Sequence, residues 1–357
     1  MIRIITKTEP SPMRENLMRI AAVAIALAAS AVIMALIGYN PFDVYAKMVQ
    51  GSLATAYRFR ETMNKTIPLV VLSLGIAVAF KMKFWNIGAE GQLYLGAFGA
   101  TFVALNFGYL PAVLLLPLMF FAGFLCGGFW AFIPAVLKAR LGASETLVTL
   151  MLNYVALKWI AYLQYGPWKD PAANGFPKIA TFGKNAILPS VFGVHIGWIV
   201  ALVLVVVMYI LLRKTKLGYE IAVLGESEAT ARYAGISVSR VTFIAIMISG
   251  GLCGAAGMMQ ASAIEHSLSE QLSGGLGNTA IITTWLARLS PPAIVVVSFL
   301  FSLLLQGGSF LQTSMKIPAT VADILQGIII FFVLGSEFFI RYRFVWTSRK
   351  NKGEAAE

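Results

Sequence analysis

The sequence has few charged residues, few cysteines and few histidines. Only 12% of its 357 residues are charged and 58% are hydrophobic, whereas a soluble globular protein carries about 25% charge. The two cysteines, Cys126 and Cys253, lie in apolar runs and are best interpreted as small packing residues, not as a disulfide. The two histidines, His195 and His266, form no H-E-x-x-H pair, so that zinc motif is excluded.

Motifs for nucleotide binding and catalysis are also missing. No G-x-x-x-x-G-K-[ST] sequence occurs, so this chain has no phosphate-binding loop of that type. The run 272–275 (LSGG) resembles the start of an ATPase signature, but without a phosphate-binding loop its glycines are better explained as a flexible entry into a helix. No nucleophile–histidine or metal constellation is evident. We therefore expect a protein that is not an enzyme and holds no cofactor or metal of its own.

Four long segments contain no Asp, Glu, Lys or Arg: 91–134, 185–212, 241–264 and 289–315. About 20 apolar residues cross the hydrocarbon core as a helix. Because lipid offers the backbone no hydrogen-bond partners, such segments form helices, and the alternating pattern of a β-barrel is absent. Glycines are frequent inside these segments, which favours close helix packing. The sequence therefore predicts an all-α polytopic membrane protein.

The hydrophobic pattern predicts about ten transmembrane helices. The expected spans are 18–38, 66–82, 87–107, 111–137, 144–165, 197–212, 241–261, 276–288, 292–310 and 318–340. This organisation leaves an N-terminal tail at 1–17, a transmembrane domain at 18–340 and a C-terminal tail at 341–357. Within the domain, the charged segment 213–240 forms a cytoplasmic loop.

Basic residues are unevenly distributed between the predicted loops. With the N-terminus inside, nineteen of the 28 Lys and Arg residues lie on the cytoplasmic side and eight lie outside, as the positive-inside rule requires. We therefore expect a multi-pass membrane protein with both termini cytoplasmic. The basic residues are spread over loops and form no single soluble face, so membrane lipid is an expected partner and nucleic acid is not.

The segment 213–240 is the one compact charged region between long apolar runs. Ser227 can cap a short helix that begins at Glu228, and Gly235 can end it. Small side chains on this helix would let it enter a groove on a partner. The alternative is an ordinary solvated loop.

Polar residues near the predicted spans are candidates for a translocation path. They are Asn86, Glu90, Gln92, Asn153, Asn278 and Thr283, together with Asp323 and Gln326. The structural alternative is that Asn86 caps a helix whose N-terminal dipole Glu90 complements.

Aromatic residues such as Tyr154 and Trp159 can stack on a planar solute, although anchoring at the membrane interface is the commoner role. Lys158, between them, is interpreted as a side chain that snorkels to the interface.

Two motifs resemble a known family. They are Asn86-Ile-Gly-Ala-Glu-Gly-Gln92 and the segment from Gly218-Tyr219-Glu220 to Ala234-Gly235-Ile236. Together they resemble the permease subunits of bacterial ABC importers for simple sugars and nucleosides, over about residues 15–345. The resemblance implies the type II importer permease fold of about ten helices, working as a permease dimer. It also implies ABC ATPase subunits that hold ATP and Mg²⁺, a periplasmic or lipid-anchored solute-binding protein, and a location in the bacterial cytoplasmic (inner) membrane.

The resemblance also implies roles for individual residues. The stretch that would correspond to the ATPase-coupling helix contains Gly225, Glu226, Ser227, Ala231, Arg232, Tyr233, Ala234 and Gly235. The family often has an Asn-Pro pair where this chain has Ser227-Glu228, which departs from its pattern. The stretch 86–92 is most similar to the nucleoside-type branch, so a heterodimer of two permeases is expected, with a homodimer as the alternative.

The expected function is ATP-driven import of a nucleoside or a related small polar solute. A pentose sugar or a riboflavin-type compound remains an alternative substrate. An ion-coupled secondary transporter is a further alternative. It would need an ionisable relay at the membrane midplane, for which Glu90 and Asp323 are the nearby candidates.

Overall fold

The structure is a computed structural model that describes residues 2–6, 12–318, 320–321, 324–325, 327–328, 331–332, 335 and 342–346. It divides into two compact units. The central unit is Thr55–Leu303, and the terminal unit combines Met1–Ala54 with Leu304–Glu357.

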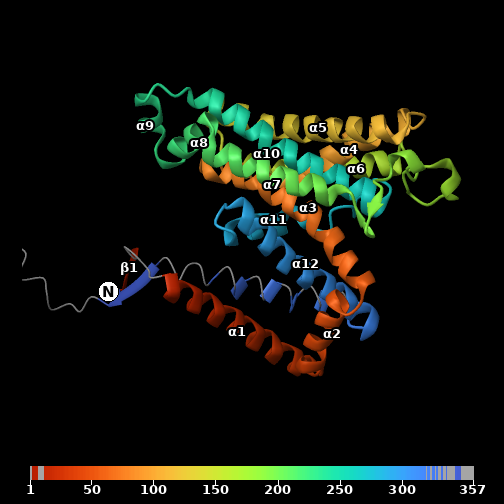
Figure 1. The fold of residues 1–357 in the computed structure, drawn as a ribbon, viewed down its shortest axis with the longest axis horizontal. Coiled ribbons are helices and arrows are strands. Elements are labelled where there is room, and N and C mark those ends of the chain that lie inside the picture. The colour runs from red at the N-terminus through yellow and green to blue at the C-terminus, as the bar shows by residue number, and fades with distance from the viewer. Residues whose placement is uncertain are drawn as a thin grey trace, which may run out of the picture. The chain divides into compact units, whose positions relative to one another are not determined.

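The central unit is built of helices that run along one another (Figure 1). Helices α3, α4, α5, α6, α7 and α10, each of at least 18 residues, and the shorter α11 form its bundle, with the connected pair α8 and α9 at one end. Their bounds are α3 Ala56–Lys81, α4 Ala89–Asn106, α5 Ala112–Leu141, α6 Glu145–Tyr165, α7 Gly197–Lys214, α8 Lys216–Glu226, α9 Glu228–Tyr233, α10 Val238–Gln260 with a π-helical turn Ala261–Glu265, and α11 Leu276–Leu286. Helix α12, Pro291–Ser314, begins in this unit.

The connection between α6 and α7 contains two 3₁₀ turns, Pro171–Ala173 and Lys184–Ala186, and a hairpin of β2 (Ser190–Val191) with β3 (Val194–His195). His195 is buried here, and its backbone N–H donates to Asn64 Oδ1 on α3 at 3.4 Å. Burial lowers the pKa of His195 to about 4, because removal from water disfavours the charged ring.

The terminal unit contains α1 (Pro12–Ile37) and α2 (Pro41–Leu53), which meet at a bend of 114°. Asn40 caps α2, since its Oδ1 accepts from the N–H of Phe42, and Pro41 takes the first helical position. The small core of this unit comprises Met34, Val44, Met48, Leu311, Ile317 and Leu325.

The predicted tails contain more structure than expected. Strand β1, Ile2–Thr6, pairs antiparallel with β4, Tyr342–Trp346, so that residues near the two ends of the chain meet. Helix α1 begins at Pro12, inside the predicted tail 1–17. Helix dominates the structure as predicted, with these strands and the β2–β3 hairpin as exceptions among the described residues.

Among the described residues, six helices are long and apolar enough to cross a membrane: α3, α5, α6, α7, α10 and α12. The count rises to seven if the bent pair α1–α2 is one span. Helices α4 and α11, which correspond to the expected spans 87–107 and 276–288, are not among them. The tenth expected span, 318–340, falls largely outside the described residues, as do Asp323 and Gln326. The predicted count of ten is therefore not confirmed.

Glycines bring α10 into backbone contact with α4 and α5. A Cβ atom added to Gly254 of α10 would lie 2.9 Å from Gly127 Cα on α5 and would collide with the carbonyl oxygen of Gly123. A Cβ added to Gly96 of α4 would collide with the Gly254 backbone. Only residues without a side chain allow three helices to approach this closely, as the sequence predicts.

Replacing Gly254 should therefore destabilise the bundle. We expect Gly254→Ala to lower the free energy of unfolding by about 1–3 kcal/mol, because the added methyl group meets backbone that cannot give way. Thermal unfolding of the purified protein in mild detergent measures the effect. Gly183→Ala is the matched control, because Gly183 has φ −64° and no atom near its added Cβ. Equal melting temperatures for the two variants would contradict this account of the crossing.

Candidate coupling segment and polar cluster

Helix α8 is fixed to the ends of two long helices. The N-terminus of α8 is capped by Thr215, whose hydroxyl oxygen accepts from the N–H of Gly218 at 3.2 Å. At its other end Gly225 is buried, and an added Cβ would collide with the carbonyl oxygen of Lys81 at the end of α3. Lys81 in turn donates through Nζ to the carbonyl of Leu212 on α7 at 3.1 Å. Helix α8 therefore cannot shift without disturbing α3 and α7.

Helix α9 follows α8 with a single residue between them. Ser227 caps α9, as predicted, because its hydroxyl oxygen accepts from the N–H of Thr230 at 3.2 Å. Arg232 and Glu228 form an ion pair of 2.6 Å on the helix surface. The chain leaves the helix through Gly235 at φ +74°, a left-handed conformation that suits glycine.

The predicted coupling residues divide into an inward and an outward set. Gly225 and Ala231 are buried, and Ser227 is half-buried. The outward set is Glu226, Arg232, Tyr233, Ala234 and Gly235. Tyr233 is the extreme case, with 96% of its surface exposed. Figure 1 shows α8 and α9 at one end of the central bundle. A fully exposed tyrosine on a capped, anchored helix is a suitable contact for a partner protein.

A hollow of about 370 Å³ lies beside α9. Basic side chains contribute to it from three segments: Lys83 after α3, Lys138 of α5 and Arg232 of α9. Glu228 is the acidic residue in its lining. Lys83 and Lys138 could not be assigned to this surface from the sequence, because only folding brings residues so far apart in sequence to one place.

A buried amide pair lies in the connection to α4. Asn86 Nδ2 donates to Gln92 Oε1 at 3.1 Å, and Gln92 Nε2 donates back to Asn86 Oδ1 at 2.8 Å. Asn86 also donates to the hydroxyl of Ser249 on α10 at 3.2 Å. The cap of α4 is Gly88 and not Asn86, so the capping interpretation of Asn86 is wrong. Its side-chain oxygen instead accepts from the N–H of Gly88 at 3.1 Å and from Gln92, and its side-chain nitrogen also reaches Ser249 across the fold.

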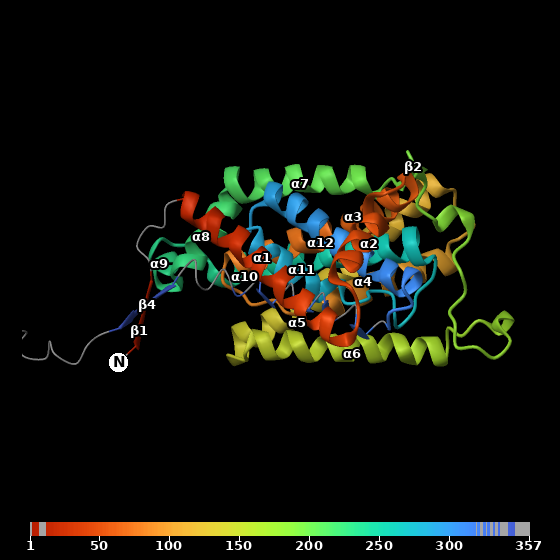
Figure 2. The same ribbon diagram turned by 90° about the horizontal axis from the view of Figure 1, so that it is seen from below.

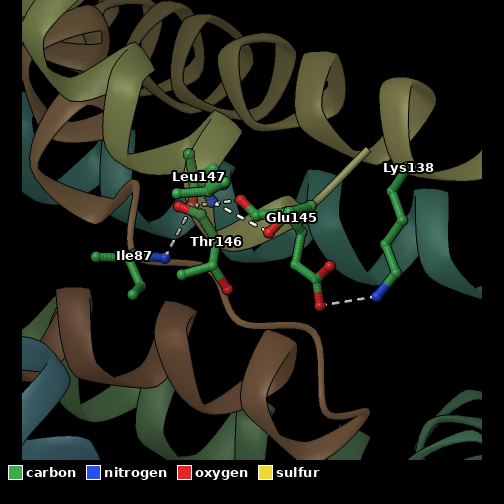
Figure 3. Close-up of polar contacts among 7 residues, drawn as sticks. Ile87, Lys138, Glu145, Thr146 and Leu147 are labelled. Atoms are coloured by element: carbon green, nitrogen blue, oxygen red, sulfur yellow. Dashed lines mark hydrogen bonds and ion pairs between the residues drawn. The ribbon is translucent and has the colours of Figure 1, made fainter. Parts of the chain in front are cut away.

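Asn153 on α6 holds the same connection from another side. Its Oδ1 accepts from the N–H of Gly91 at 2.8 Å, and its Nδ2 donates to the carbonyl of Ile87 at 2.9 Å. Figure 3 shows the neighbouring start of α6, where Glu145 pairs with Lys138 of α5 at 2.9 Å beside Ile87. Polar bonds near the starts of α4 and α6 thus join α6 to α4, through Asn153, and α6 to α5, through Glu145.

Glu90 and Thr283 fix the short helix α11. The Oε2 atom of Glu90 accepts from the N–H of Gly277, in the first turn of α11, at 2.7 Å. A carboxylate at a helix N-terminus is stabilised by the free N–H groups and the helix dipole. Farther along α11, the hydroxyls of Thr283 and Ser73 are 2.6 Å apart. Glu90 therefore complements the dipoles of two helices: that of α4, in whose first turn it lies, and that of α11, to which it is hydrogen-bonded.

The six candidate path residues thus fall into two groups. Asn86, Gln92 and Asn153 surround the start of α4, whereas Glu90 binds α11 from α4, and Thr283 on α11 binds Ser73 of α3. Asn278, also on α11, is exposed.

Comparison with known proteins gives relatives that match most of the chain. A glucose ABC transporter permease protein of Haloferax volcanii is 35% identical over 89% of this chain and 87% of its own length. A guanosine ABC transporter permease protein of Bacillus subtilis is 32% identical, covering 93% and 96%. A nucleoside ABC transporter permease protein of Lactococcus lactis is 31% identical, covering 90% and 91%.

Each of these three organisms has a second such permease that matches at lower identity. The values are 28%, 28% and 25%, over 64% to 68% of this chain. The family model described as the branched-chain amino acid transport system permease component matches residues 59–334. This match covers most of the central unit and extends into α12 and beyond. The chain therefore belongs to the family of permease components of branched-chain amino acid transport systems.

Proposed function

We propose that this chain is the permease subunit of an ATP-driven ABC importer for a nucleoside or a related small polar solute. Family membership and the ABC permease relatives support the permease role. Two of those relatives are described as nucleoside and guanosine permeases, at 31% and 32% identity, which favours a nucleoside.

A sugar is the second candidate substrate. The Haloferax volcanii relative, described as a glucose permease, is 35% identical, so sequence similarity alone does not separate the two substrate classes. A riboflavin-type compound is a weaker alternative. Ion coupling is less well supported, because Glu90, an ionisable candidate for a relay, already accepts a hydrogen bond from Gly277.

The single observation that carries the coupling role is the anchored, exposed pair α8–α9. We assign ATP hydrolysis, with its ATP and Mg²⁺, to separate ATPase subunits that contact Glu226, Arg232 and Tyr233. Because α8 is packed on the ends of α3 and α7 through Gly225 and Lys81, a push on α9 would reach the membrane helices directly. The basic hollow beside α9 suits acidic side chains on such a partner.

The same assignment orients the protein. The ATPase side is the cytoplasm, so α8 and α9 lie there, with both chain termini. The concentration of Lys and Arg in the loops predicted for that side supports this orientation. The opposite side then receives solute from a binding protein, and the membrane is the cytoplasmic one.

We assign the second position of the permease dimer to a different permease chain. The paired permeases of three organisms support this, since in each pair one member is more similar to this chain than the other. A homodimer is the alternative outcome.

We assign the polar residues around α4 and α11 to the control of the translocation path. Helix α11 has 11 residues, too few to cross the membrane. Glu90 and the Ser73–Thr283 contact hold it at two points. Gly277 of α11 also packs on the backbone of Glu90, where an added Cβ would lie 2.6 Å from the amide nitrogen. Asn86, Gln92 and Asn153 would keep α4 in place behind it, whereas exposed Asn278 could meet the solute.

Loss of the Tyr233 side chain should uncouple transport. We expect Tyr233→Ala to reduce ATP-dependent uptake at least about tenfold, since exposed tyrosines at interface centres are frequent hot spots. Uptake of labelled guanosine into proteoliposomes that contain the whole complex measures this. Tyr109→Ala is the control, because Tyr109 is also highly exposed but lies in the α4–α5 turn. Unchanged uptake by Tyr233→Ala would refute the coupling assignment.

Two substitutions at Glu90 should differ in severity. Glu90→Leu leaves the N–H of Gly277 without its acceptor, which costs about 1–3 kcal/mol. Glu90→Gln keeps an acceptor and loses only the charge, worth about 0.3–1 kcal/mol at a helix N-terminus. We expect the melting temperature of the complex and its uptake to fall more for Leu than for Gln. Equal behaviour of the two variants would show that Glu90 does not fix α11.

Purification of the tagged chain from its native membrane in mild detergent should recover its partners. We expect mass spectrometry to identify an ATPase with a phosphate-binding loop and a second, different permease in similar amount. An ATPase without a second permease would replace the heterodimer by a homodimer. Recovery of neither would contradict the importer proposal.

A further inference from the structure

The outward face of α6 differs in chemistry from those of α5 and α7. The exposed positions of α7 from Ile199 to Ile210 are all aliphatic, and those of α5 from Val113 to Phe129 are aliphatic, proline or phenylalanine. Such faces suit lipid. The exposed positions of α6 are Leu147, Met151, Tyr154, Val155, Lys158, Trp159, Tyr162 and Tyr165. They recur at helical spacing and form one stripe that includes a charge and three phenol groups.

This stripe lies at the edge of the central unit. Figure 2 shows α6 and α7 along opposite edges of that unit, with the other helices between them. The buried side of α6 packs toward α4 through residues such as Asn153 and Ala156. The stripe points the other way, and Tyr154, Val155, Lys158, Trp159 and Tyr162 line an open hollow of about 580 Å³.

Lys158 is the residue that does not suit lipid. It lies seven residues before the end of α6, about 10 Å along the helix axis, and its side chain is 76% exposed. Its ammonium group is 3.8 Å from a carboxylate oxygen of Glu270, in the loop before α11. A lysine that only snorkels to the interface needs no acidic partner. Ionisable side chains within a membrane instead face a water-filled cavity or another protein.

Glu270 is itself held in place. Its backbone N–H donates to Gln164 Oε1 on α6 at 2.9 Å, and its carbonyl accepts from the hydroxyl of Tyr94 on α4 at 2.5 Å. Trp159 is positioned as well, with its ring 6.0 Å from that of Phe98 and 5.7 Å from that of Tyr162. The Lys158–Glu270 pair and the ring of Trp159 are therefore held in defined positions by neighbouring residues.

We propose that the Tyr154–Tyr162 stripe of α6, with the Lys158–Glu270 pair, lines the aqueous path and binds the passing nucleoside. This inference rests on the proposed function. The open faces of Trp159, Tyr154 and Tyr162 offer stacking surfaces to a flat heterocycle, which every nucleobase provides. Lys158 supplies donors for the oxygen and ring-nitrogen acceptors of a base edge, and Glu270 supplies acceptors for amino and hydroxyl groups.

Cysteine accessibility tests whether the stripe meets water. In the whole complex with Cys126→Ala and Cys253→Ala, Tyr154→Cys and Lys158→Cys are treated with a charged methanethiosulfonate. Val206→Cys on the aliphatic face of α7 is the control. We expect the α6 cysteines to react at least about tenfold faster than the control and guanosine to slow that reaction. If the α6 cysteines react no faster than the control cysteine, the proposal is overturned. Lipid or a second permease covering the stripe would give that result.

Solute protection and uptake identify what the path carries. We expect Trp159→Leu, which removes a stacking surface, and Lys158→Met, which removes charged hydrogen-bond donors, each to reduce guanosine uptake about tenfold. Phe129→Leu on α5 should leave uptake unchanged. Guanosine uptake that is intact in both α6 variants overturns the binding role and leaves the nucleoside function standing. If glucose slows the reaction of the α6 cysteines and guanosine does not, both the nucleoside function and nucleoside binding at the stripe are overturned.

Discussion

The backbone contact of α10 with α4 and α5 is the constraint on which the rest of the central unit depends. In lipid there is little hydrophobic force to drive helices together, so close van der Waals contact has to hold them. Gly96, Gly123, Gly127 and Gly254 make that contact possible, because a Cβ at any of them would meet a neighbouring helix. Helices α3, α6 and α11 are then added around this three-helix block.

The shorter helices α8 and α11 are attached at fewer points, by backbone contact together with polar bonds. Helix α11 is held through hydrogen bonds to Glu90 and Ser73, and α8 through backbone contact at Gly225 and the Lys81 bond to α7. The central block is thus held by backbone contact between three helices, whereas α8 and α11 are attached to their neighbours at a few points. This division fits a protein that must open and close a path while keeping its seal in the membrane.

Local features of the fold could be predicted from the sequence, and long-range ones could not. The helical class, the cap at Ser227 and the stop at Gly235 follow from residues that are neighbours in sequence. The bond from Asn86 to Ser249 was not predicted, since these residues are 163 positions apart in the sequence. The Glu90 contact with Gly277 is equally remote. The predicted count of ten spans is not confirmed, since α4 and α11 are not among the helices that are long and apolar enough to cross a membrane.

The candidate site shows the same limit. Sequence placed the coupling residues in one segment, and the structure keeps them together on α8 and α9. The sequence could not show that Lys83 and Lys138 join them, or that Lys158 faces Glu270. Those pairings depend on how whole helices lie beside one another, which no local pattern encodes.

The most direct test of the coupling assignment is to identify which protein Tyr233 contacts when the chain is in its native membrane. A photoreactive phenylalanine analogue at position 233 of the full chain, expressed in its native host, would be irradiated and its adducts identified by mass spectrometry. The account predicts a cross-link to an ATPase subunit that is lost when the analogue is moved to position 109. A cross-link to lipid alone, or to no protein, would contradict the assignment of α8 and α9 as the coupling segment.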